Sequence, residues 1–288
     1  MEEASSDTEK KEKETPDKAI VAFIDILGYE GLVNRLSNDL EMIKSLDSLL
    51  QGVSADLLHA MRTKVSLESH LPEPYDEYSK RLFHPINAKF ISDTILITLH
   101  LSKVETSFPH FSEKENLSHC VFSYLYFIAS ACTQFIGITG LLVRGGISMG
   151  PHYENLHNGS LFILSQAYID AYKLEGEADM PRILIDDKVL EFTKYLPLEE
   201  LNRFVFVDSS GRKCFDIYAI FENEPRSPAI LSSIKERVSG NMFKIRQDKE
   251  VLRKFIHFFE YHNQRVAQLG FADLTLDLTG PKKYFQTL

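Results

Sequence analysis

Two aspartates in this sequence stand where carboxylates can do metal chemistry. Asp25 ends the apolar run Ala19–Ile24, which predicts a buried strand, and Asp93 lies at the tip of a predicted hairpin. If the hairpin lies beside the first strand, both carboxylates reach one edge of a sheet. Carboxylates without histidine or thiol ligands favour hard cations such as Mg²⁺ or Mn²⁺. A pair of these ions about 3.5–4 Å apart supports in-line phosphoryl chemistry.

Both positions also have a purely structural interpretation. Asp25 can cap the helix expected after the strand, and aspartate is a common turn former at a position such as Asp93. A carboxylate that ends a buried strand is nevertheless costly unless it is paired or binds a metal. The spacing of the two residues leaves both interpretations open.

The elements that must position these residues follow the order strand, helix, hairpin, helix, strand. Helical spacing over 30–65 follows the first strand, and the hairpin occupies 87–100. An apolar helix to about Phe135, a glycine-containing turn and a strand from about Leu141 come next. This βαββαβ order is ferredoxin-like and predicts an α+β fold, with an antiparallel sheet and helices on one face.

The remaining segments extend this core. Residues 160–175 predict a helix, 182–186 a strand, and 204–207 with 214–221 a second hairpin. A long amphipathic helix over about 242–269 closes the chain.

Charge and composition exclude several classes of partner. The chain has 32 Lys and Arg against 41 Asp and Glu, a net charge of −9, so a broad phosphate-binding surface for nucleic acid or an anionic membrane is not expected. Residues 1–18 are polar and charged and predict a disordered acidic tail without a secretory signal. Three cysteines without a CxxC pair predict reduced thiols and a cytoplasmic location.

One apolar segment is long enough to cross a membrane. Residues 120–143 contain no Asp, Glu, Lys or Arg. Polar side chains and two glycines, Gly137 and Gly140, interrupt the segment. We therefore expect a core helix followed by a buried strand, with no stable membrane insertion.

Four ordered motifs carry a resemblance to a known family. Residues 23–29 (FIDILGY) resemble the F-x-D-I-x-G-F motif of class III nucleotidyl cyclases, and 89–93 (KFISD) are similar to their K-x-x-G-D hairpin. Residues 144–151 (RGGISMGP) resemble their R-x-G-I-x-x-G-P strand. Residues 171–175 (AYKLE) are similar to the end of their N-x-A-x-R-L-E helix. The resemblance spans roughly 20–221 and implies a cyclase-like fold.

The resemblance implies a metal-dependent reaction on a nucleoside triphosphate. Asp25, Asp93 and the carbonyl of Ile26 would bind two Mn²⁺ or Mg²⁺ ions per site. The ribose 3′-hydroxyl would attack its own α-phosphorus, giving a 3′,5′-cyclic nucleotide and pyrophosphate. Gly28 and Tyr29 would belong to the phosphate-binding turn before a helix N-terminus.

Three further residues receive roles from the same resemblance. Lys89 would read a carbonyl oxygen of the base, because lysine offers donors only. Phe23 would pack against the base or ribose, and Lys173 would bring positive charge to the transition state. Each has an alternative or a weakness: Lys89 can be a solvated strand residue, Phe23 can be core, and Lys173 stands where the family has arginine.

The sequence also departs from the family pattern. The two aspartates are 68 residues apart, which suggests an insertion at about 37–85. Ser92 replaces the hairpin glycine, and Ile169 stands where the family has asparagine. The expected organisation is a tail (1–18), a cyclase-like domain (19–222) and a C-terminal helical extension (223–288).

These departures resemble one subgroup, the pyrimidine cyclases of the Pycsar antiphage system. That likeness implies a homodimer that converts UTP or CTP to cyclic UMP or cyclic CMP, with sites shared between protomers. The product would activate a separate effector during phage infection. A purine cyclase in signalling and a non-catalytic nucleotide-binding module are the alternatives.

The histidines give no zinc motif by spacing. His152 and His157 are five residues apart, as are His257 and His262. Neither pair would share a helix face, so this pattern predicts no zinc site on a helix.

Overall fold

The computed structural model describes residues 16–30, 33, 44, 82, 84–104, 112–157, 160–196, 199–222, 227–245 and 248–279. The predicted tail over 1–18 and the predicted insertion over 37–85 fall almost entirely outside these residues, as does the helical pattern over 30–65. The expected domain limits therefore stay predictions.

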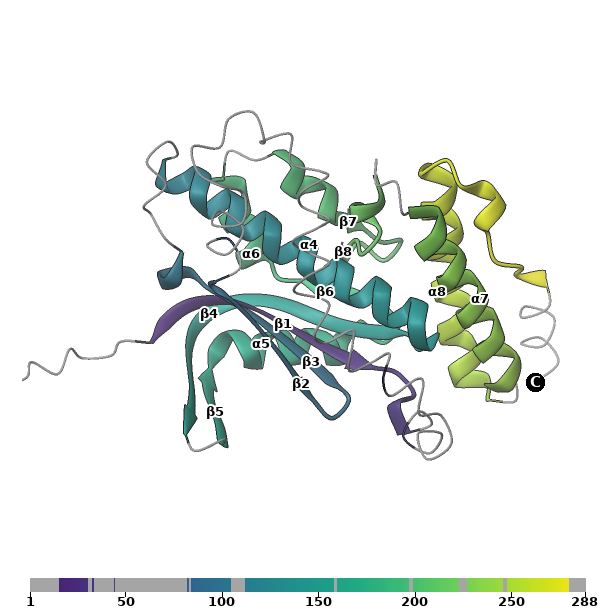
Figure 1. Cartoon of the computed structure of the whole chain (residues 1–288), viewed down its shortest axis with the longest axis horizontal. Coiled ribbons are helices and arrows are strands. Elements are labelled where there is room, and N and C mark those ends of the chain that lie inside the picture. Colours follow the sequence, from purple (N-terminus) through teal and green to yellow (C-terminus); the bar gives the residue numbers. More distant parts are fainter. Residues whose placement is uncertain are drawn as a thin grey trace, which may run out of the picture.

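A single sheet of eight strands forms the centre of the described part of the chain (Figure 1). The order is β2-β3-β1-β4-β6-β8-β7, and β5 pairs with β4. The first four strands in this order are antiparallel neighbours, which is the strand arrangement that the βαββαβ order predicts. The α+β prediction is confirmed. The strands are β1 (Asp17–Ile26), β2 (Ile86–Ile91), β3 (Thr94–His100), β4 (Val143–His157), β5 (Ser160–Ser165), β6 (Ile183–Ile185), β7 (Val205–Val207) and β8 (Lys213–Phe215).

Helices cover both faces of this sheet. In Figure 1, α4 lies across one face and α5 lies on the other. The expectation of helices on one face only is therefore wrong. The longer helices of the described residues are α4 (Glu113–Thr139), α5 (Gln166–Ala178), α6 (Asp187–Lys194), α7 (Ser227–Ile245) and α8 (Lys249–Gln268).

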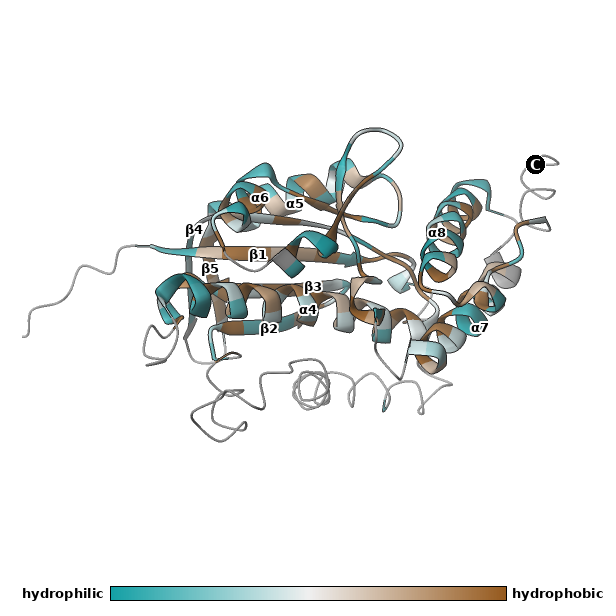
Figure 2. Cartoon of the chain, turned by 90° about the horizontal axis from the view of Figure 1, so that it is seen from above, coloured by the Kyte–Doolittle hydropathy of each residue, from teal (hydrophilic) through white to brown (hydrophobic). Residues whose placement is uncertain are grey.

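The strand β1 explains why two helical layers are needed. Its side chains alternate: Ile20, Ala22 and Ile24 join the main core with α4, whereas Val21 and Phe23 join a second cluster with α5. A strand buried on both faces reads as a continuous apolar run rather than an alternating one. Figure 2 shows β1 and β3 side by side next to α4.

The apolar helix α4 belongs to the core. By length and composition it could cross a membrane, but 83% of its 18-residue apolar window is buried inside the protein. Its hydroxyl side chains at Ser123, Thr133 and Thr139 donate to backbone carbonyls one turn earlier, so burial leaves them satisfied. Gly140 ends the helix with φ 67°, a left-handed conformation that favours glycine.

Four expectations about local structure are corrected. Residues 160–165 form strand β5, because their exposure alternates and Ser165 caps the helix that starts only at Gln166. The long C-terminal helix is two helices, since Asp248 caps a new start. The second hairpin ends at Phe215 and turns into a 3₁₀ segment over 219–221. The sheet is mixed, because β4 and β6 are parallel across the α5 crossover.

Candidate functional site

The two predicted metal ligands meet at the C-terminal end of β1. Asp25 lies opposite Thr94 of β3, the residue that follows Asp93. The Ile26 amide donates to the backbone oxygen of Asp93 at 2.8 Å, which ties the hairpin turn to the strand end. The expected placement of both aspartates at one sheet edge is what the structure shows.

The turn keeps its shape without the glycine of the family motif. Ser92 adopts φ 58°, the left-handed region that is unfavourable for residues with a Cβ. The hairpin pairing on both sides, from Ile91–Thr94 outward, holds this conformation. Replacing glycine by Ser92 therefore leaves Asp93 at the tip.

A single arginine organises the acidic groups at this edge. Arg144 lies opposite Asp25 on β4, and its Nε is 3.3 Å from Asp25 Oδ2 and 2.5 Å from Glu175 Oε1. We call Asp25, Asp93, Arg144 and Glu175 the carboxylate cluster. Arg144 and Glu175 stand in two of the motifs, but the sequence reasoning gave them no role. Their opposite charges in consecutive motifs were the signal for this pair.

Burial and repulsion both act on the acids of the carboxylate cluster. Burial raises the pKa of Asp25, Arg144 opposes this, and the negative charge of Asp93 raises it further. Burial likewise raises the pKa of Glu175, with Arg144 opposing and Asp25 adding to the rise. The Asp25 side chain is 20% exposed and that of Glu175 is 7% exposed. The cluster thus holds more negative charge than Arg144 alone offsets.

A glycine lets α5 bring Glu175 to this edge. A Cβ on Gly146 would lie 2.5 Å from the Leu174 Cβ and in contact with the Ala171 carbonyl. Only glycine allows the backbones of β4 and α5 to come this close. Gly146 is therefore a structural requirement of the carboxylate cluster.

The donor set of the carboxylate cluster fits hard divalent cations. Asp25 and Asp93 offer carboxylate oxygens, the ligands that Mg²⁺ and Mn²⁺ prefer. A cation there would also offset the repulsion that raises the pKa of Asp25.

The other residues of the first motif have structural surroundings. Phe23 is 6% exposed and packs edge-on against Tyr168 and Tyr172 of α5, with ring centroids 5.5 and 5.3 Å apart. This is the core alternative for Phe23. Gly28 is exposed with φ 83° and turns the chain, while Tyr29 packs its ring against the main core.

Neither predicted lysine joins the carboxylate cluster within one chain. Lys89 on β2 forms an ion pair with Glu154 of β4. The side chain of Lys173 on α5 is 65% exposed, with its Nζ 4.0 Å from Asp170 Oδ1. The described chain thus brings together Asp25 and Asp93 but leaves Lys89 and Lys173 apart from them.

Comparison with known proteins gives structural neighbours but no sequence relatives. No protein-family model and no curated protein matches the sequence. The structure is similar to the monomeric guanylyl cyclase domain of the RhoGC fusion protein from the aquatic fungus Blastocladiella emersonii, with 15% identity and a TM-score of 0.41 over 69% of this chain and 94% of that one. It is also similar to the adenylyl cyclase CyaB from P. aeruginosa, with 12% identity and a TM-score of 0.39 over 69% and 94% of the two chains.

A bacterial light-regulated adenylyl cyclase is a third neighbour, with 11% identity and a TM-score of 0.37 over 76% of this chain and 98% of that one. Identities and scores this low describe a similar arrangement of elements and carry nothing about activity. The residues of the chain itself must support any functional proposal.

Proposed function

We propose that this chain is a nucleotide cyclase that converts a nucleoside triphosphate to a 3′,5′-cyclic nucleotide and pyrophosphate. One observation carries the proposal: the hairpin and β1, which hold two of the four motifs, bring Asp25 and Asp93 to one sheet edge. The other two motifs supply Arg144 and Glu175 at the same edge.

Each group at this edge has a part in the proposed reaction. Divalent cations bound by Asp25 and Asp93 would supply the positive charge that binds the triphosphate and acidifies the ribose 3′-hydroxyl. Arg144 holds the Asp25 carboxylate in place from the neighbouring strand. The 3′-oxygen forms the new bond to the α-phosphorus, and the bond to pyrophosphate breaks.

A homodimer would complete the site. Large apolar side chains are exposed on the β2–β3 hairpin, on β5 and on α5, the elements that carry or flank Lys89 and Lys173. Burying such a patch against a second copy is favourable. In this arrangement Lys89 and Lys173 of one protomer would reach the triphosphate held by Asp25 and Asp93 of the other. The exposed residues are Phe90, Ile91, Phe162, Leu164, Ile169 and Tyr172.

The proposed substrate is UTP or CTP. A base-reading lysine donates to a carbonyl oxygen, and both pyrimidine bases present one. Of the two we favour UTP. The role of the product as a messenger to a separate antiphage effector comes from the resemblance to the Pycsar cyclases. A cytoplasmic location agrees with three buried free thiols, Cys120, Cys132 and Cys214.

The test is a nucleotide panel. The purified chain is incubated with Mn²⁺ and each of UTP, CTP, ATP and GTP, with and without phage lysate, and cyclic products are identified by mass. Cyclic UMP or cyclic CMP supports the full proposal, and a purine product supports a cyclase of the other class. Absence of any cyclic product under all conditions would overturn it.

Matched variants locate the chemistry. Asp25→Asn and Asp93→Asn should each lower turnover on the order of 100- to 1000-fold, because each removes a negative charge that the bound cations need. Asp273→Asn, which changes an exposed aspartate on the C-terminal segment, is the control. Full activity in either of the first two variants would contradict the metal assignment.

A second candidate function is a nucleotide-binding module without turnover. The exposed side chains of Lys173 and Ile169, at the positions of the family arginine and asparagine, favour it. Calorimetry with a non-hydrolysable UTP analogue and Mn²⁺ separates the two functions. Metal-dependent binding without product supports the module, whereas product supports the cyclase.

A further inference from the structure

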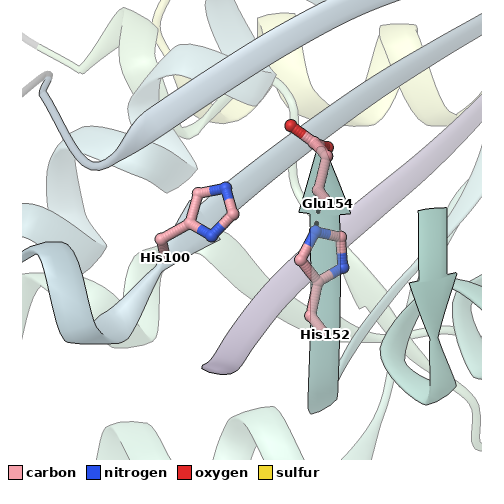
Figure 3. Close-up of side chains that lie close together, drawn as sticks. All are labelled: His100, His152 and Glu154. Carbon is pink, nitrogen blue, oxygen red and sulfur yellow. Dashed lines mark ion pairs between the residues drawn. The ribbon is translucent and has the colours of Figure 1, made fainter. Parts of the chain in front are cut away.

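A second group of metal-binding side chains lies at the opposite end of the same sheet face. His100 at the end of β3 and His152 and Glu154 on β4 place one ligand atom each within 4.8 Å of one another (Figure 3). Asp17 and Asp25 mark the two ends, and the eight-residue step along β1 corresponds to about 26 Å. We call His100, His152 and Glu154 the histidine cluster.

The histidine cluster is buried. His152 is 1% exposed and His100 is 5% exposed, while the Glu154 side chain is 8% exposed. Among the described residues, His100 Nε2, His152 Nε2 and Glu154 Oε2 are buried atoms without a hydrogen-bond partner. Buried polar atoms are normally paired, so three unpaired buried atoms in one group of side chains need an explanation.

The far ring nitrogens of the two histidines also have neighbours. His152 Nδ1 is 2.8 Å from Ser165 Oγ, a hydrogen bond of the kind that fixes the orientation of metal-binding histidines. His100 Nδ1 is 3.5 Å from Asp17 Oδ2, an oxygen that is itself buried without a hydrogen-bond partner among the described residues.

One oxygen of the Glu154 carboxylate is also bound by neighbouring side chains. Asn87 Nδ2 donates to Glu154 Oε1 at 2.6 Å, and Lys89 pairs with the same oxygen. This leaves Oε2 on the side of His152, whose Nε2 is 3.7 Å away, too far for a hydrogen bond. Each of the three side chains thus has an unpaired buried polar atom, and ligand atoms of the three lie within 4.8 Å of one another.

We propose that the histidine cluster binds a first-row transition-metal ion of the Zn²⁺ class, with His100 Nε2, His152 Nε2 and Glu154 Oε2 as ligands. Two imidazoles and a carboxylate are a donor set typical of zinc, and imidazole disfavours Mg²⁺ and Ca²⁺. Three protein ligands leave a fourth position for water.

The protonation states of the histidine cluster suit this ion. Burial lowers the pKa of His100, and the charges of Lys103 and His152 lower it further, which favours the neutral imidazole that binds metal. Burial would raise the pKa of Glu154, but the nearby His152 and Lys89 outweigh this and lower it to about 2. Glu154 is thus ionised.

The ion would join two strands that helical spacing cannot relate. His100 ends β3, His152 is the last residue of β4 that pairs with β1, and Glu154 lies two residues further along β4. The histidine pairs considered in the sequence were each five residues apart on one segment. Here a residue of one strand meets two alternate residues of another. The site does not depend on the proposed cyclase reaction.

Zinc uptake by the full chain tests the proposal. The protein is stripped with a chelator and titrated with Zn²⁺ alone in a calorimeter, and the loaded protein is analysed for metal content. We expect one tightly bound Zn²⁺ per chain in the parent and in Asp25→Asn/Asp93→Asn, which removes the carboxylate ligands. Failure of the parent to bind zinc stoichiometrically would overturn the proposal.

Ligand variants tie the uptake to this cluster. His152→Ala and Glu154→Gln should weaken Zn²⁺ binding by about 100-fold or more, whereas His84→Ala, which removes an exposed histidine, should not. Unchanged affinity in both cluster variants would contradict the assignment.

Cobalt substitution needs no variant that could misfold. Co²⁺ bound to the parent through two imidazoles and a carboxylate should give the strong visible absorption of a four-coordinate site, and Zn²⁺ should displace it. The weak spectrum of hexahydrated or all-oxygen Co²⁺ would count against the histidine cluster.

Discussion

The carboxylate cluster and the histidine cluster occupy two ends of one sheet face, yet their chemistry differs. At the C-terminal end of β1, Asp25, Asp93 and Glu175 crowd negative charge around Arg144. At the N-terminal end, His100 and His152 present nitrogen atoms without partners beside Glu154. The first end is partly open to solvent, whereas the second is closed.

The side chains that surround each end of β1 determine which class of metal ion that end can bind. Open oxygen donors suit hard cations that enter and leave with a phosphate substrate. Closed imidazole donors suit an ion that stays. The helix α5 contacts both ends, since Ser165 at its N-cap meets His152 and Glu175 in its last turns meets Arg144.

Disturbing α5 should therefore affect both ends at once and have the largest effect on stability. Gly146→Ala places a Cβ against the Ala171 carbonyl and the Leu174 Cβ, and overpacking of this kind costs about 3 kcal/mol. Urea denaturation measures the loss, and zinc affinity and turnover should both fall.

Gly176→Ala is the matched control on α5 itself. An added Cβ there meets nothing within 4 Å, and alanine is favoured over glycine in a helix by about 1 kcal/mol. This variant should be as stable as the parent or more so. Equal stability of Gly146→Ala and Gly176→Ala would refute the role given to Gly146.

The sequence predicted the strand framework of the carboxylate cluster well, because its signals are local. The apolar run before Asp25 indicates a strand and its end, and the polar tip at Asp93 indicates a hairpin turn. The order of these elements then determines which strands are neighbours.

The histidine cluster was not predicted, because it depends on register between distant segments. His100 and His152 meet only when β3 and β4 flank β1 at a particular register, which no spacing within one segment reveals. The sequence pattern of β5 predicts a helix for a related reason, since its pairing with β4 and the cap at Ser165 make it a strand.

The next largest effect concerns Arg144, the positively charged side chain of the carboxylate cluster. Arg144→Gln leaves Asp25 and Glu175 facing each other without a positive charge, and we expect a loss of about 2 kcal/mol in unfolding free energy. Adding Glu175→Gln should restore part of it, which a double-mutant cycle measures.

Arg253→Gln is the control for loss of an arginine. Its partners Asp179 and Glu250 are 58% and 59% exposed, and such surface pairs contribute less than about 0.5 kcal/mol. If Arg253→Gln lowers the unfolding free energy as much as Arg144→Gln does, the difference in solvent exposure does not explain the strength of the Arg144 ion pairs.

The two ends should also respond to pH with opposite signs. Burial raises the pKa of Glu175, so ionising Glu175 destabilises the folded protein. This penalty is absent at a pH below the ordinary pKa of glutamate and develops as the pH rises through the folded pKa. The pKa of Glu154 is lowered to about 2, so ionised Glu154 stabilises the folded protein. This contribution is present at a pH above the ordinary pKa of glutamate and is lost as the pH falls toward about 2.

Urea denaturation of metal-free protein between about pH 3 and 7 tests this contrast. Relative to the parent, Glu154→Gln should lose on the order of 2 kcal/mol at neutral pH and progressively less in acid. Glu175→Gln should gain relative to the parent as pH rises. If the stability of the two variants relative to the parent changes with pH in the same direction, the predicted opposite pH dependence of the two clusters is wrong.

The smallest effect on stability is expected at Lys173, outside both clusters. Its side chain is 65% exposed and 4.0 Å from Asp170, so Lys173→Met should change the unfolding free energy by less than about 0.5 kcal/mol. If a second protomer supplies Lys173 to the carboxylate cluster, turnover should nevertheless fall by about 10- to 100-fold, and Lys173→Arg should retain it.

Mixing Lys173→Met with Asp25→Asn sharpens the result, because mixed dimers regain one intact site when the two residues act from different chains. No recovery of turnover on mixing would place both residues in the same chain's site and leave the carboxylate cluster complete without a partner.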